Sequence, residues 1–283
     1  MKKLLTLILV SCVLLSGCGM RVAIDAADRV LETAPELQRV ESSVFLIHGI
    51  TTEYADGREE KQKFEFDNRN YPRSCTYYLD GSKTGTDTYT VDEYGSILTV
   101  TPDYPEGKVQ TFSYTYNENG NILTEEGYVG GSLDYTAEYS YNESGTLIRK
   151  VITSLTGLRS EYTYDAQGRE LERIDYDGDV LLYRTVTEYA DHGKKLSVTV
   201  YASDDSVTRR EEYSFDAKSS KETVLEYSGE DLLLQKRVVT YDTYDNPMME
   251  EVYSPDGTLI STTYRHIVQH RFIDYVEVTE PTQ

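Results

Sequence analysis

The chain has 283 residues, of which 39% are hydrophobic, and a formal net charge of -21. A field of that sign repels phosphate backbones and anionic lipid head groups, so we expect no nucleic acid partner. Trp is absent while Tyr occurs 26 times, which favours a thin sheet packed with tyrosine over a dry globular interior.

The N-terminus has the features of an export signal. Lys2 and Lys3 precede an apolar run of about 12 residues, Leu4 to Leu15. That run is shorter than the roughly 20 residues that a membrane-spanning helix needs. Residues 1–17 are therefore predicted to be a signal peptide. An ordinary signal peptide cleaved nearby and a buried helix are the alternatives.

The end of this segment resembles the lipobox of bacterial lipoproteins, in the run Leu15, Ser16, Gly17 and Cys18. The resemblance implies that Cys18 is lipidated and becomes the new N-terminus. It also implies an exported protein that the lipid on Cys18 anchors to a membrane of the bacterial cell envelope. The loss of Lys2 and Lys3 would leave 26 basic against 49 acidic residues, a net charge of -23.

The cysteines then leave no partner for a disulfide. Cys12 departs with the signal peptide and Cys18 carries lipid, so Cys75 remains as the one other cysteine. We expect Cys75 to be a small strand residue and the fold to be held by packing and hydrogen bonds.

Residues 18–43 are predicted to be a tether. Apolar residues recur there at three- and four-residue steps before Pro35, a pattern typical of a short amphipathic helix. From Val44 the apolar period changes to two, so the strand array is predicted to cover residues 44–275. The last residues, 276–283, are expected to fray.

The first expected strand contains a misleading pattern. Residues 45–49, Phe-Leu-Ile-His-Gly, resemble the oxyanion strand of α/β-hydrolases. However, no Gly-x-Ser-x-Gly follows and no helices alternate with the strands, so a hydrolase is rejected. His48 is interpreted as a strand residue at the edge of the array.

An internal repeat dominates the rest of the chain. One position, which we name the repeat marker, recurs at steps of 25, 25, 25, 23, 25, 26 and 26 residues. The markers are Phe66, Val91, Tyr116, Tyr141, Tyr164, Tyr189, Phe215 and Tyr241. An Asp or Asn follows most markers, and a turn residue stands four positions after each. These turn residues are Asn70, Gly95, Gly120, Gly145, Gly168, Gly193, Ser219 and Asp245.

The best-kept repeat lies between Tyr162 and Asp179. Asp165 to Gly168 forms its first expected turn, because Asp bonds its own backbone and Gly accepts a positive φ. Asp177 and Gly178 form the second turn, a strong hairpin signal. Parallel strands would need long crossovers, for which there is no room.

These signals predict an all-β fold, an antiparallel meander of about eight two-stranded hairpin repeats with a period of about 25 residues. The twist of strands should coil so long a sheet into a spiral or an open trough. A four-bladed propeller is the alternative, although its period would be about 50 residues. The segment 261–277 is expected to cover the last sheet edge.

The runs YTYDAQGR, YTYNENGN and YSYNESGT resemble the YD repeats of RHS and teneurin-type proteins, over residues 64–265. The resemblance implies a spiralling sheet of β-hairpins, which in that family closes into a shell around cargo. This chain is shorter and has no terminal core motif or toxin domain after Tyr264, so an open spiral is expected. The turns also resemble MORN repeats, whose units are shorter.

The sequence contains no catalytic constellation, so we expect a non-enzymatic binding or structural scaffold without cofactors. Its partner at the cell surface would be a protein or a glycan; the glycan alternative requires rows of exposed tyrosines. Adjacent acids such as Asp204 and Asp205, or Glu211 and Glu212, should point to opposite strand faces and cannot act as a catalytic pair. A metal on His266 and His270 lacks further ligands, and acids in the turns are explained by backbone bonding better than by calcium.

Overall fold

The computed structural model describes residues 37–105 and 107–277, with side chains described from residue 44 to residue 270. These residues form one antiparallel sheet of 18 strands. The strands are β1 (Leu37–Tyr54), β2 (Glu59–Phe66), β3 (Pro72–Leu79), β4 (Ser82–Val91), β5 (Ile97–Pro102), β6 (Gln110–Tyr116), β7 (Ile122–Val129), β8 (Ser132–Tyr141), β9 (Leu147–Ser154), β10 (Leu158–Tyr164), β11 (Glu170–Asp177), β12 (Val180–Tyr189), β13 (Lys195–Ala202), β14 (Val207–Asp216), β15 (Lys221–Ser228), β16 (Leu233–Tyr241), β17 (Pro247–Tyr253) and β18 (Leu259–Glu277). The described part of the chain includes no helix of membrane-spanning length and hydrophobicity.

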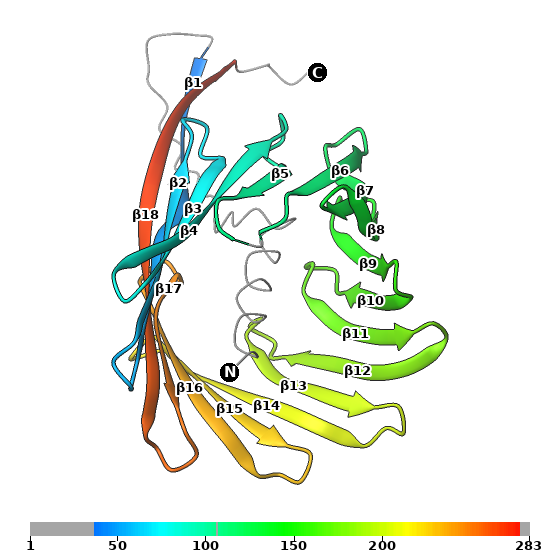
Figure 1. Cartoon of the computed structure of the whole chain (residues 1–283), viewed down its shortest axis with the longest axis vertical. Helices are drawn as coiled ribbons and strands as arrows, with labels where there is room; N and C mark the ends of the chain where they lie inside the picture. The colour runs from blue at the N-terminus through cyan, green and yellow to red at the C-terminus, as the bar shows by residue number, and fades with distance from the viewer. Residues whose placement is uncertain (1–36, 106, 278–283) are drawn as a thin grey trace, which may run out of the picture.

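The sheet closes on itself, which corrects the expected spiral or open trough. Each strand pairs with its neighbours in the chain, and β1 also pairs with β18, from Leu37 opposite Glu277 to Tyr54 opposite Ser261. Figure 1 shows the resulting ring, with β1 beside β18. The antiparallel all-β meander is therefore confirmed, and its two ends join to form a β-barrel.

The ends of the array also differ from the prediction. β1 begins at Leu37, seven residues before the expected start at Val44, and β18 continues to Glu277. The segment 261–277 does more than cover an edge, because it forms the closing pair with β1. The predicted signal peptide, the predicted helix before Pro35 and the tail 278–283 lie outside the described residues.

Repeated β-bulges bend the sheet and account for its closure. At most repeat markers the pairing register shifts by one residue, as between Thr115 and Tyr116, Ser140 and Tyr141, or Thr163 and Tyr164. A second series of shifts occurs near the other turns, for example between Asp175 and Tyr176. Each bulge bends its strand and increases the twist. A series of bulges around the ring supplies the curvature that a spiral prediction omits.

In seven of the eight repeats the first turn is held by a side-chain oxygen of the residue after the marker, as the sequence predicts; the exception has Ala190 there, and the Lys194 N–H donates to His192 Nδ1 at 3.3 Å. Asp165 Oδ1 accepts from the backbone N–H groups of Gln167 and Arg169, both at 2.9 Å, and Asn142 Oδ1 accepts in the same way from Ser144 and Thr146. The glycine four positions after the marker has a positive φ, 78° at Gly168. In one repeat the positive φ falls on Ser220 and not on the predicted Ser219. There, β14 and β15 pair without a bulge, so the turn lies one residue later.

One junction of the ring is narrow. β5 and β6 pair only through Thr99 with Thr111 and Val100 with Gln110. Pro102 ends β5 and Pro105 follows in the connection, and proline cannot donate to a ladder. Figure 1 shows the two strands separating beyond this short contact.

Replacing Asn142 by Ala should destabilise the fold by about 1–2 kcal/mol, because two backbone N–H groups of the turn lose their acceptor. Thermal or urea unfolding measures the change. Asn142→Asp is the matched control: the equivalent Asp165 holds its turn in the same way, so we expect a change below about 0.5 kcal/mol. Equal losses in both variants would show that the acceptor oxygen is not what holds the turn.

Candidate functional site

One face of the sheet collects the tyrosines and the buried charges. Directly opposed residues of antiparallel strands share a face, and the register places Tyr114 opposite Glu125, Glu125 opposite Ala137, and Ala137 opposite Ile152. The most buried side chains of these strands lie here, including Ala137 and Glu125, which are 2% and 3% exposed. We name it the tyrosine face; its markers and preceding aromatics include Tyr114, Tyr116, Tyr139, Tyr141, Tyr162, Tyr164, Tyr189 and Tyr213.

Tyrosine hydroxyls on this face bond one strand to the next. Tyr141 donates to the carbonyl oxygen of Ile122 at 2.8 Å, and Tyr189 donates to that of Glu170 at 2.9 Å. At the narrow junction Tyr114, two residues before its marker, donates to the carbonyl oxygen of Ile97 at 2.9 Å. Compared with the pairs β7–β8 and β11–β12, β6 is thus displaced by two residues along β5, and Tyr114 takes the place of the marker.

Cations of the chain itself cover many of the rings. The guanidinium of Arg169 lies 4.5 Å from the ring centre of Tyr189, and that of Arg159 lies 4.3 Å from Tyr176. Lys194 lies 4.5 Å from the ring of Phe215. Such contacts contribute about 0.5–1 kcal/mol at exposed sites. Because these ring faces are occupied, they are closed to a sugar ring.

Glu125 is the centre of a buried hydrogen-bond cluster. Its two carboxylate oxygens accept from the hydroxyls of Tyr135 at 2.5 Å and Tyr139 at 2.6 Å. Burial and the nearby carboxylate raise the pKa of both hydroxyls, so they stay protonated as donors. Asp87 accepts similarly from Tyr77 at 2.8 Å, and burial raises the pKa of its carboxyl. These acids therefore serve packing between strands.

A second cluster pairs opposite charges across five strands, β14 to β18. Glu211, which is 6% exposed, contacts Arg209 at 2.6 Å and Arg237 at 3.3 Å, and it also accepts from the hydroxyl of Tyr213. Arg265 contacts Glu250 at 3.0 Å further along. Burial opposes ionisation of Glu211, but Tyr213 and the two arginines lower its pKa below the usual value.

The adjacent acids do not form catalytic pairs. Glu211 is buried and Glu212 is exposed, so they point to opposite faces of β14, as predicted. Asp204 and Asp205 lie in the turn before β14, not on a strand: Asp204 accepts from the Ser206 N–H at 3.0 Å and Asp205 contacts Arg184 at 3.3 Å.

The histidines meet at the closing pair of strands. His48 of β1 stands at a bulge between Ile47 and Gly49, and its Nε2 lies 3.1 Å from Nε2 of His270 on β18. His266 is further away, with 6.3 Å between its ring centre and that of His48. Among the described residues, no three His, Cys, Asp or Glu side chains are grouped so that they could hold a metal ion. Burial, His270 and His266 lower the pKa of His48.

The two predicted cysteine sites have different outcomes. Cys75 on β3 is completely buried, at 0% exposure, in the small strand position that the sequence indicates. Cys18, the predicted lipidation site, lies outside the described residues.

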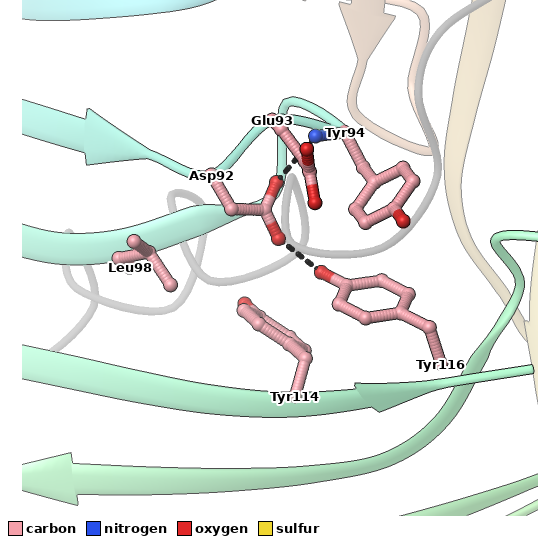
Figure 2. A pocket seen from close by; sticks show the side chains of 6 residues that line it. All are labelled: Asp92, Glu93, Tyr94, Leu98, Tyr114 and Tyr116. Carbon is pink, nitrogen blue, oxygen red and sulfur yellow. Dashed lines mark hydrogen bonds between the residues drawn. The ribbon is translucent and has the colours of Figure 1, made fainter.

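The narrow junction carries a surface pocket of about 550 Å³. It is lined by Asp92, Glu93, Tyr94, Leu98, Tyr114 and Tyr116. Figure 2 shows the two carboxylates from the β4–β5 turn opposite the rings of Tyr114 and Tyr116 on β6. The Tyr116 hydroxyl donates to Asp92, and burial together with this bond raises its pKa to about 12. Sequence analysis identified Tyr116 and Asp92 only as parts of the repeat, because the displacement of β6 that brings Tyr114 beside them has no sequence signal.

Apolar side chains form a second surface feature, which we name the apolar row. The seventh residue after the marker is apolar and exposed in four successive repeats. These residues are Leu123, Ile148, Leu171 and Leu196, which are 38%, 38%, 39% and 48% exposed. Each is the second residue of its strand, so the row follows one end of the strands β7, β9, β11 and β13.

Comparison with known proteins defines the family. Residues 65–217 match the profile of a family described as "Uncharacterised protein". Since the match covers more than half of the chain, the chain belongs to this family. No curated protein matches it.

Three solved structures show distant likeness. A porin-like protein from Bacteroides uniformis is 9% identical over 82% of this chain and 96% of its own, with a TM-score of 0.34. A chain of the Tc holotoxin pore of Photorhabdus luminescens is 12% identical over 78% of this chain and 15% of its own, with a TM-score of 0.25. A chain of the TcdB2–TccC3–TEV structure is 10% identical over 84% of this chain and 19% of its own, with a TM-score of 0.22. At these TM-scores the likenesses support no functional conclusion.

The His48–His270 pair predicts a loss of stability in acid. The folded pKa of His48 lies below the unfolded value of about 6.5, so the unfolded state binds more protons between these two values. Stability should be complete above about pH 6.5 and should fall as the pH drops below it. Thermal unfolding between about pH 7.5 and 5.5 measures the effect.

His48→Gln should flatten this dependence in the same pH range. The control is His192→Gln, in an exposed turn between β12 and β13, which should leave the dependence unchanged. A flat profile in the unmodified chain would contradict the role given to the pair.

Proposed function

We propose that the protein is a lipid-anchored, non-enzymatic scaffold of the bacterial cell envelope that binds another protein. The observation that carries the binding role is the apolar row. One exposed apolar side chain in each of four successive repeats makes a regular line on a surface that is otherwise rich in charge. Exposed apolar side chains that recur along one end of neighbouring hairpins are a feature that protein interaction sites can use.

The absence of an enzymatic role is supported by how the chain uses its chemical groups. The buried acids Glu125 and Glu211 are engaged by tyrosine hydroxyls and arginines that join neighbouring strands. A general acid or base would need a group available to substrate. The proposal of a lipid anchor rests on the four residues that end at Cys18.

Polar groups on both faces of the sheet support tethering rather than insertion into lipid. The tyrosine face holds carboxylates such as Glu125 and Glu211, and the opposite face carries threonine pairs such as Thr90 with Thr99 and Thr115 with Thr124, each 2.6 Å apart. Strands in contact with lipid instead present apolar side chains. A face of this kind suits a protein held above the membrane by its lipid.

Glycan binding remains the second candidate. Its supporting observation is the exposed ring of Tyr94, 51% accessible, beside the carboxylates of Asp92 and Glu93. The exposed tyrosines Tyr94, Tyr183, Tyr244 and Tyr264 come from separate parts of the ring, so stacking would occur at single sites and not along a row. Saturable peptidoglycan binding that Tyr94→Ala abolishes would favour this candidate.

The test is performed with the full chain in cells. Cys18→Ala should move the protein from the membrane fraction to the soluble fraction, because the lipid is the proposed anchor. Replacing Leu171 and Leu196 together by Asp should remove the cross-linked protein partner while the protein stays folded and membrane-bound. The matched control is Leu155→Asp, which changes a leucine of 67% exposure at the other end of β9.

Two results would contradict the proposal. Unchanged membrane association of Cys18→Ala would remove the anchor. Cross-linking that survives the change of Leu171 and Leu196, or is lost equally with Leu155→Asp, would remove the apolar row as the partner surface.

A further inference from the structure

We propose that the pocket at the β5–β6 junction binds a small organic cation, an alkylammonium or alkylguanidinium group. The pocket is the one lined by Asp92, Glu93, Tyr94, Leu98, Tyr114 and Tyr116. This ligand class extends the binding role proposed above for the scaffold, and it rests on that proposed role.

In two later repeats the fifth residue after the marker is basic and lies over the next marker ring. Arg169, the fifth residue after its marker, contacts the turn carboxylate of Asp165 at 2.6 Å and lies over the next marker ring, Tyr189, at 4.5 Å. In the following repeat Lys194 lies over Phe215 at 4.5 Å, although Ala190 replaces the turn acid there and the 3.7 Å contact of Lys194 is with Asp245 of a later turn. A guanidinium therefore occupies the position between a turn carboxylate and a marker ring, and an ammonium can lie over a marker ring.

The pocket has the same carboxylate and the same ring but lacks the cation. Asp92 corresponds to Asp165, the displaced Tyr114 takes the place of Tyr189, and Ser96 stands where Arg169 would be. The displacement of β6 also brings Tyr116 close enough to donate its hydroxyl to Asp92. Across the described residues no Lys or Arg stacks on Tyr94, Tyr114 or Tyr116, in contrast to the rings of later repeats.

The surrounding sequence supplies no substitute cation. Between Lys83 and Arg149 the single basic residue is Lys108. The Lys108 side chain lies beside Gly130, in the β7–β8 turn. This turn is at the opposite end of β6 from Tyr116.

In the neighbouring β2–β3 turn, Arg69 lies over Tyr71, whose hydroxyl donates to the Glu93 carbonyl oxygen. The Arg69 guanidinium, however, is paired with Asp67 at 3.3 Å. A cation from solution could therefore pair with Asp92 and Glu93.

The geometry of the pocket suits a cation with an alkyl stem. The ring centres of Tyr94 and Tyr116 are 4.7 Å apart and those of Tyr114 and Tyr116 are 6.1 Å apart, so the rings form a concave aromatic wall. Figure 2 shows the carboxylates of Asp92 and Glu93 opposite Tyr114 and Tyr116, with Tyr94 beside Glu93 and Leu98 at one end. Aromatic faces attract organic cations, and the nearby carboxylates add to that attraction. The stem would pack on Leu98.

The full chain in detergent is titrated with n-butylammonium and with n-butylguanidinium, and binding is measured by calorimetry and saturation-transfer NMR. n-Butanol, which has the same alkyl chain but no charge, is the control ligand. Both cations should bind saturably and more weakly at high salt, while n-butanol should not bind. Comparison of the two cations shows which head group the pocket prefers.

Two variants test the pocket with substitutions that other repeats of the chain already contain, so the fold should be kept. Asp92→Asn preserves the turn, as Asn117 and Asn142 do in the next repeats, and should weaken cation binding about tenfold. Ser96→Arg supplies the internal cation that Arg169 supplies elsewhere and should abolish binding. Thr146→Arg, the same turn position in another repeat, should leave binding unchanged.

Binding of n-butanol equal to that of the cations, binding retained by Ser96→Arg, or no saturable binding of either cation would overturn the proposal. If circular dichroism shows that Ser96→Arg does not fold, Asp92→Asn provides the test, and unchanged cation binding by Asp92→Asn would overturn the proposal. Failure of these titrations would leave the membrane anchor and the apolar row untouched, because those are read from fractionation and cross-linking. The two proposals can therefore fail separately.

Discussion

The pairing of β1 with β18 is the constraint on which the rest of the structure depends. A meander of hairpins has two free edges, and each free edge exposes unpaired backbone groups that invite pairing with another chain. Here the longest strands of the ring, of 18 and 19 residues, lie at the two ends of the array, and their backbone groups pair with each other. Closure of this kind removes edges altogether and fixes the register of every strand between.

The tyrosine face shows how a sheet with so few large aliphatic core residues is stabilised. Completely buried large side chains are few among the described residues, with Val224 and Cys75 below 2% exposure. Tyrosine occupies one face of the sheet, donates its hydroxyl to a neighbouring strand and stacks its ring against a cation. Carboxylates such as Glu125 and Glu211 are tolerated there because they are hydrogen-bonded or ion-paired, and a buried charge without partners would be costly. The same use of acids reduces the number available for chemistry.

Much of this fold is predictable from local signals. The side chains of Asp165 and Asn142 determine their turns, the marker spacing determines the hairpins, and short connections require antiparallel pairing. Closure was not predicted, because the repeat spacing gives the positions of markers such as Tyr116 and Tyr164 but not the one-residue register shift that occurs there. The start at Leu37 was missed because the partner of that segment, the end of β18, lies more than two hundred residues away. The pocket depends on a displacement of β6 that only the paired structure reveals.

A cross-link between the two ends of the array tests closure most directly. Thr52 and Thr263 face each other on β1 and β18, with hydroxyl oxygens 2.8 Å apart. In a chain with Cys12→Ser and Cys18→Ser, the pair Thr52→Cys and Thr263→Cys should form a disulfide on mild oxidation, seen as a mobility shift without reductant. The control is the pair Thr90→Cys and Thr99→Cys on the adjacent strands β4 and β5. Its disulfide yield is the yield expected for two directly paired strands. A comparable yield is the result that a closed ring predicts; no cross-link between residues 52 and 263, while the adjacent-strand pair forms, would show that the sheet is open.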